Sequence, residues 1–100
     1  MENRKTSSIT ETYNKVAQKF LLSHEQLQRA SLISYLSARK KSLMNERFEI
    51  LSRYRVTDVN EMEEKIKQGA LAEHPSWEDL IDLRNIGAEI QGVADDIDSL

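Results

Sequence analysis

The chain has 100 residues, of which 31% are charged, 39% hydrophobic and 6% aromatic, and its net charge is −3. It has no cysteine, which excludes disulfide scaffolds and thiolate zinc sites, and no apolar run approaches the roughly 20 residues that span a bilayer. The polar start MENRKTSSITET lacks the apolar core of a secretion signal, so we expect a cytoplasmic protein without a membrane segment.

The first half of the chain predicts two helices. Residues 1–7 are expected to be frayed, and an S-x-x-E capping box at Ser8 precedes an apolar helical face over residues 9–22. At Ser23 the chain can bend or continue straight, and the pattern leaves both alternatives open. A long helix over residues 24–55 follows, roughly 48 Å in length. Its apolar side is lined by Leu27, Ala30, Ile33, Leu36, Met44, Phe48, Leu51 and Tyr54.

The second half predicts a short helix and a final longer one. Asp58 caps a helix over residues 59–68, and Gly69 ends it. A last helix over residues 76–98 carries a heptad-like seam, formed by Leu80, Leu83, Gly87, Ile90, Ala94 and Ile97. We therefore predict a single all-α domain over residues 1–100. Its fold would be a long-helix hairpin or coiled-coil-like bundle with a short linking helix, completed by self-association because so small a core is thin.

The sequence contains no recognisable catalytic, cofactor or metal motif. Glycine-rich phosphate loops, nucleophile elbows, H-E-x-x-H and zinc-finger spacings are all absent from it. Glu73, His74, Glu78 and Asp79 resemble a metal cluster, but carboxylates in the first turn of a helix are typical capping charges. We therefore expect no enzymatic activity, no cofactor and no metal.

Charge is unevenly distributed along the chain. Residues 1–56 hold eleven Lys or Arg against five acids, whereas residues 57–100 hold three against twelve. Complementary halves that fold against each other or against a second copy explain this pattern. The alternative is a basic half that meets nucleic acid or an acidic half that meets a basic partner. The nucleic-acid candidates are Arg39, Lys40, Lys41, Arg47, Arg53 and Arg55.

Two runs of sequence resemble a group of small all-helical prokaryotic proteins. The run RYRVTDVNEMEEKIKQG (residues 53–69) and the run EHPSWEDL (residues 73–80) are similar to the antitoxin-like members of toxin–antitoxin-like gene pairs. That resemblance implies a helical protein that wraps and neutralises a partner. The chain departs from the pattern at Arg55, where the group tends to have Gly, and its first 50 residues match only in helical character.

The predicted function is a non-catalytic protein–protein interaction module of antitoxin-like type. We expect a homo-oligomer that also binds a protein partner encoded nearby. The alternatives are a nucleic-acid-binding regulator that uses the basic half and a purely structural coiled-coil oligomer. The candidate partner contacts are Trp77, His74, Leu80, Leu83, Ile90 and Ile97.

Overall fold

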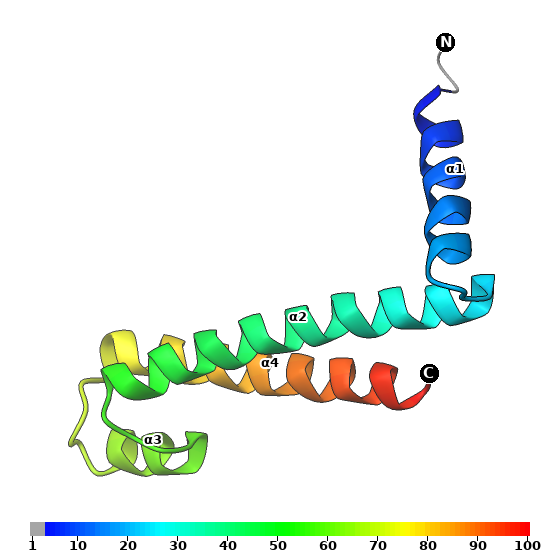
Figure 1. The fold of residues 1–100 in the computed structure, drawn as a ribbon. Helices are drawn as coiled ribbons and strands as arrows, with labels where there is room; N and C mark the ends of the chain where they lie inside the picture. Colours follow the sequence, from blue (N-terminus) through cyan, green and yellow to red (C-terminus); the bar gives the residue numbers. More distant parts are fainter. Residues whose placement is uncertain (1–3) are drawn as a thin grey trace. The chain divides into compact units, whose positions relative to one another are not determined.

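The computed structural model describes residues 4–100, with side chains from Ser8 onward, as an all-α fold (Figure 1). Its helices are α1 (Arg4–Lys19), α2 (His24–Arg53), α3 (Val59–Lys67) and α4 (Glu73–Asp98). The prediction of an all-α fold built on long helices is thus confirmed. Self-association stays a prediction.

Several helix ends differ from the predicted ones. The first helix begins at Arg4 and ends at Lys19, not at residues 9 and 22, and the second ends at Arg53, not at residue 55. Residues 4–7, expected to be frayed, belong to α1, while residues 1–3 lie outside the described part of the chain. The C-terminal ends of α1 and α2 both come earlier than predicted for the same reason. In each case a residue with positive φ, Leu21 or Arg55, lies just beyond the helix.

The chain divides into two compact units, residues 1–35 and residues 36–100, and the division falls within α2. We call them the N-terminal unit and the C-terminal unit. The prediction of one domain over residues 1–100 stays a prediction.

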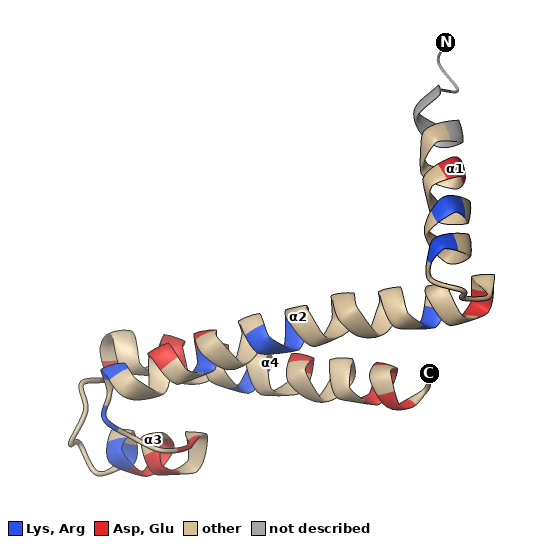
Figure 2. Ribbon diagram, viewed as in Figure 1, with Lys and Arg blue, Asp and Glu red and all other residues tan. Residues whose placement is uncertain are grey.

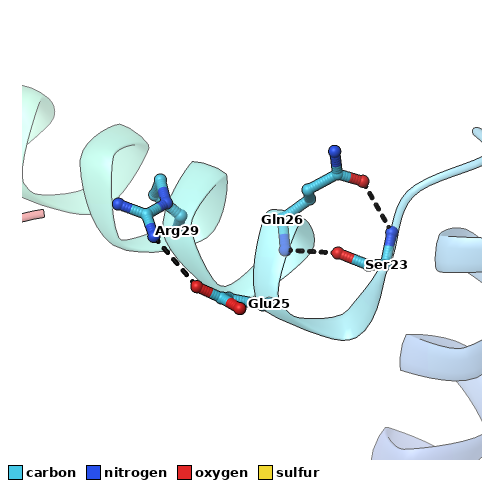
Figure 3. A network of polar contacts seen from close by, with 4 residues as sticks. All are labelled: Ser23, Glu25, Gln26 and Arg29. Carbon is cyan, nitrogen blue, oxygen red and sulfur yellow. Dashed lines mark hydrogen bonds and ion pairs between the residues drawn. The ribbon is translucent and has the colours of Figure 1, made fainter.

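The chain breaks between α1 and α2 through two local devices. Leu21 has a φ of 57°, and the Leu22 N–H donates to the Ala17 carbonyl at 2.8 Å, which is the Schellman pattern of a helix end. The Gln26 N–H then donates to the Ser23 hydroxyl at 3.0 Å, and the Ser23 N–H donates to the Gln26 side chain at 2.8 Å (Figure 3). This reciprocal capping box starts α2, so the chain takes the bent alternative at Ser23.

The end of α2 repeats the first of these devices. Arg55 has a φ of 55°, and the Val56 N–H donates to the Leu51 carbonyl at 3.1 Å. The side chains of Leu51 and Val56 are both buried in one core cluster, the apolar contact that commonly accompanies a Schellman motif. Arg55 therefore adopts the left-handed conformation that glycine tolerates best.

Polar caps fix both ends of α3. The Asp58 carboxylate accepts from the Glu61 N–H at 2.8 Å. At the other end Gly69 has a φ of 77°, and the Ala70 N–H donates to the Lys65 carbonyl at 2.9 Å. Asp58 and Gly69 therefore have the roles that the sequence predicts for them.

The first residues of α4 are irregular. His74 has non-helical angles (φ −111°, ψ 132°), and the peptide bond between His74 and Pro75 is cis. Regular helix thus begins only after His74, although the element is counted from Glu73 rather than from the predicted residue 76.

The core of the C-terminal unit lies where the end of α2, α3 and the first half of α4 meet. Its buried cluster consists of Leu51, Val56, Met62, Ile66, Leu80 and Leu83. Farther along, the part of α2 from Leu36 onward continues beside α4 (Figure 1). Leu43 and Val93 are buried in this stretch. Since α3 has nine residues, about 13 Å of helix, it covers only part of the 26-residue α4, which is about 39 Å long.

Candidate protein-interaction site

A surface hollow of about 360 Å³ lies where the end of α3 meets the start of α4. Ile66, Lys67, Glu73, His74 and Trp77 line it. Ile66 is buried, whereas Trp77 keeps 43% of its surface exposed. A half-exposed Trp beside an apolar wall offers a large, rigid contact area to another molecule. The structure thus brings two predicted contact residues, His74 and Trp77, to one place.

An ion-pairing contact orders the rim of this hollow. His74 Nδ1 lies 2.6 Å from a Glu78 carboxylate oxygen, and both side chains are exposed. The contact is an ion pair only when His74 is protonated. Among the side chains that the structure describes, from Ser8 onward, no group of three or more His, Asp or Glu is placed to hold a metal ion.

A polar network at the end of α2 fixes the first turn of α4. The Tyr54 hydroxyl donates to the Asp79 carboxylate, and the Arg53 guanidinium lies 3.1 Å from the same carboxylate. Burial raises the pKa of the Tyr54 hydroxyl, and its hydrogen bond to Asp79 and the negative charge of Asp79 raise it further. Smaller opposing effects come from a hydrogen bond with the buried Ser76 and from the charge of Arg53. Trp77 directly follows Ser76 in the chain.

Ion pairs fix α3 on α4 at the other side of the hollow. Glu63 on α3 pairs with Arg84 on α4 and, at 3.4 Å, with Lys67 on its own helix. The Glu63 side chain is only about one quarter exposed, so these pairs are better shielded from solvent than typical surface pairs. The two helices that frame the hollow are therefore held together by both apolar and charged contacts.

The other predicted contact residues lie on different parts of α4. Leu80 and Leu83 are buried in the chain's own core, so their side chains are engaged within the chain rather than open to a partner. Ile90 and Ile97 are half-buried. Ile97 borders a second hollow, of about 550 Å³, together with Met44 of α2. The six candidates therefore do not form one surface.

Two of the six basic candidates for nucleic-acid binding pair with acids of the chain itself. Arg39 lies 2.6 Å from Glu89 of α4, and Arg53 pairs with Asp79, so both contact acids of the chain itself. Basic and acidic residues are interspersed along this part of α2 (Figure 2). The remaining candidates are half-buried or exposed: Lys40, Lys41, Arg47 and Arg55.

Sequence reasoning did not single out Met44 and Phe48 as surface residues. Both belong to the predicted apolar stripe of α2, yet 49% of Met44 and 69% of Phe48 are exposed. They border a third hollow, of about 280 Å³. The available signal was the shortness of the third helix, because nine residues cannot cover a stripe that runs the length of α2.

Within residues 4–100, no helix combines the length and the apolarity that a membrane crossing requires.

The fold and the Trp77 hollow define a small all-α protein that carries exposed large apolar side chains on its helices. The family model described as Uncharacterized protein MJ0235 family matches residues 2–99, and the chain belongs to this family. Comparisons with curated proteins and with solved structures gave no match. Membership of this family gives no evidence of an association with toxin–antitoxin gene pairs. That association rests on the sequence resemblance alone.

Proposed function

We propose that this chain is a non-catalytic helical module that binds one partner protein, the product of a neighbouring gene, and neutralises or regulates it in the manner of an antitoxin. The observation that carries the proposal is the half-exposed Trp77 beside Ile66 and His74 in the hollow between α3 and α4. The Trp indole presents apolar area and an N–H donor together, which is why Trp is enriched among residues that dominate binding energies.

The chemistry of the rim suggests the kind of segment that would bind. Glu73 lines the hollow and Glu78 flanks it, while Lys67 lies on the α3 side. The whole of residues 57–100 has twelve acids against three bases. A partner segment with an apolar side chain flanked by Lys or Arg would match this arrangement, since opposite charges speed association and fix orientation.

The experiment is co-expression of the tag-free chain with the product of its neighbouring gene, followed by purification and titration. Trp77 is the only Trp of the chain, so its fluorescence reports directly on the hollow when a Trp-free form of the partner is used. We expect co-purification and a change in emission on binding. Trp77→Ala should weaken binding by about 30-fold, the loss typical of a central Trp contact. Tyr35→Ala is the control, because Tyr35 is an exposed aromatic residue outside the hollow.

Two outcomes would overturn the proposal. One is recovery of the chain alone, with unchanged Trp77 emission and no growth effect when its gene is deleted beside its neighbour. The other is retention on heparin with salt-dependent duplex binding in place of a protein complex, which is the result expected of a nucleic-acid-binding regulator. A defined oligomer that binds neither would be a structural coiled-coil protein.

A further inference from the structure

The apolar surface at the Trp77 hollow continues along α4. Ile81 lies one helical turn beyond Trp77, on the same side of the helix. Trp77 is 43% exposed and Ile81 is 46% exposed, whereas Leu80, the neighbour of Ile81 in the chain, is fully buried in the core. Two large apolar side chains therefore lie next to each other outside the core. We define the Trp77–Ile81 face by these two side chains and the hollow beside Trp77.

Acidic side chains border this face. Glu78 and Asp82 directly follow its two apolar residues in the chain, so they form a neighbouring row on α4, and both are exposed. Two bases also lie near the face: Lys67 lines the hollow, and Arg84 comes three residues after Ile81. Both of these bases pair with Glu63 of α3. The face therefore presents apolar area with a negatively charged flank.

The backbone around this face favours a helix as the element that binds it. An extended segment gains its affinity by adding to the edge of a sheet, where donors and acceptors alternate. All the elements of residues 4–100 are helices, so the described part of the chain offers no such edge. A helix satisfies its own backbone hydrogen bonds and can pack on α4 through its side chains alone.

We propose that the partner segment that binds the Trp77 hollow is a basic amphipathic helix, which lies along α4 and covers both Trp77 and Ile81. This inference rests on the proposed function and adds to it the form and the charge of the partner's contact element. One apolar side chain of that helix enters the hollow beside Trp77, and a second, one turn farther along, packs on Ile81. Lys or Arg on its flank then meets Glu78 and Asp82, which fixes the orientation of the helix.

The first test replaces the apolar residue that lies outside the hollow. Ile81→Asp places a charge in the contact and should weaken binding of the neighbouring gene's product at least about tenfold, as followed by Trp77 emission. Ile81 is nearly half exposed, so the helical circular dichroism spectrum should persist. Phe48→Asp is the matched control: it puts the same charge at an exposed apolar residue of α2 that does not line the Trp77 hollow, and it should leave binding unchanged.

The second test reverses the charge of the flank. A chain with Glu78→Lys and Asp82→Lys should bind the partner about tenfold more weakly at low salt, and the loss should shrink as salt is added. A partner whose basic residues on the bound helix are changed to Glu should bind this chain better than it binds the wild type. Glu46→Lys with Glu49→Lys is the control, because it makes the same change of net charge at two exposed acids of α2.

The third test reads the conformation of the partner segment directly. Carbon chemical shifts of the isotopically labelled partner in the complex should show a helix in the segment that the chain protects from amide exchange. A bound segment that is extended would overturn the inference. So would full binding by Ile81→Asp together with a loss on Trp77→Ala, because the partner would then use the hollow alone and the proposed function would stand without this inference.

Two further results would overturn the inference in other ways. Failure of the charge-reversed pair to bind would remove the role of Glu78 and Asp82. An oligomer of the chain alone that Ile81→Asp dissociates, measured by light scattering, would show that a second copy covers this face. The absence of any complex with the neighbouring gene's product would remove the proposed function as well, so the failure of each is recognised by a different result.

Discussion

The two units of this chain end their helices by the same local rules but differ in how they cover apolar surface. Of the described residues, Ala17 is the only buried hydrophobic residue in the N-terminal unit, whereas eight are buried in the C-terminal unit. Six of the ten exposed large hydrophobic residues lie in the smaller N-terminal unit. A unit of 35 residues with so little buried surface cannot be expected to fold independently.

Local hydrogen bonds set where a helix of this chain ends, whereas burial of its apolar side chains stabilises it. Leu21 and Arg55 both end a helix with a positive φ and the same hydrogen-bond pattern. After Arg55 the chain continues into Val56, which is buried in the core, whereas after Leu21 it continues into Leu22, which stays half-buried. Local signals therefore place the ends of helices in both units, but only the C-terminal unit adds a core to them.

The largest expected effect comes from replacing one leucine by alanine in each of the two units and comparing the losses of stability. Leu80→Ala, at a fully buried position, should lower the free energy of unfolding by about 3 kcal/mol through lost burial and the cavity left behind. Leu32→Ala makes the same chemical change at a half-exposed position of the N-terminal unit, and it should cost less than about 1 kcal/mol. Urea unfolding followed by circular dichroism measures both.

Equal losses in the free energy of unfolding for Leu80→Ala and Leu32→Ala would contradict this difference between the two units. In that case the N-terminal unit would bury Leu32 in solution as firmly as the core buries Leu80. Repeating the measurement over a range of protein concentrations distinguishes burial in an oligomer from burial within one chain.

An intermediate effect is expected at Tyr54, which joins α2 to α4. Its pKa is raised in the folded chain, so folding favours the protonated hydroxyl. The stabilisation is complete below the ordinary Tyr pKa of about 10 and is lost as the pH rises through the folded-state pKa. Tyr54→Phe should cost about 1–2 kcal/mol at neutral pH, the range for a partly exposed hydrogen bond to a carboxylate.

The measurement is thermal or urea unfolding of both proteins between pH 8 and about 11.5, a range chosen to bracket the Tyr pKa. The gap in stability between wild type and Tyr54→Phe should narrow as the pH rises. Tyr35→Phe is the control, since Tyr35 is exposed and this change should leave the alkaline loss of stability in place. A gap that stays constant with pH would show that the Tyr54 hydroxyl contributes nothing through its protonation.

Much of the architecture was predictable because it rests on signals that lie close together in the sequence. The Asp58 cap and the Gly69 stop each involve residues within a few positions of one another, and each forms as its pattern suggests. The Ser23–Gln26 box is equally local, but the sequence had left both a bend and a straight helix open there. The helix ends at Leu21 and Arg55 were not predicted, because Leu and Arg are residue types that rarely adopt a positive φ. At Arg55 the resemblance to a group that tends to have Gly was the available clue.

The candidate site was predictable only in part because it depends on contacts across the chain. His74 and Trp77 were among the predicted partner contacts, and they line one hollow. Leu80 was chosen from the same helix by its heptad position, yet heptad position cannot tell a seam that faces a partner from one that faces α3. Met44 and Phe48 were missed for the converse reason: they have a core pattern, yet 49% of Met44 and 69% of Phe48 stay exposed.

The smallest expected effect is a gain in stability from glycine at the two left-handed positions. A non-glycine residue at positive φ costs about 1–2 kcal/mol, and glycine loses about half of that advantage to its larger entropy when unfolded. Arg55→Gly should therefore raise the free energy of unfolding by about 0.5–1 kcal/mol. Arg55→Ala removes the same side chain but keeps the strained conformation, so it should give no gain.

Leu21→Gly extends this test to the other unit. Its local gain should be similar, but the global unfolding transition of the C-terminal unit should not move, because the N-terminal unit contributes little buried surface to it. Amide hydrogen exchange in α1 and α2 measures the local effect, with Leu21→Ala as the matched control. A shift of global unfolding as large as that of Arg55→Gly would mean that the two units unfold together. In that case the coupling must come from contacts beyond the local helix ends.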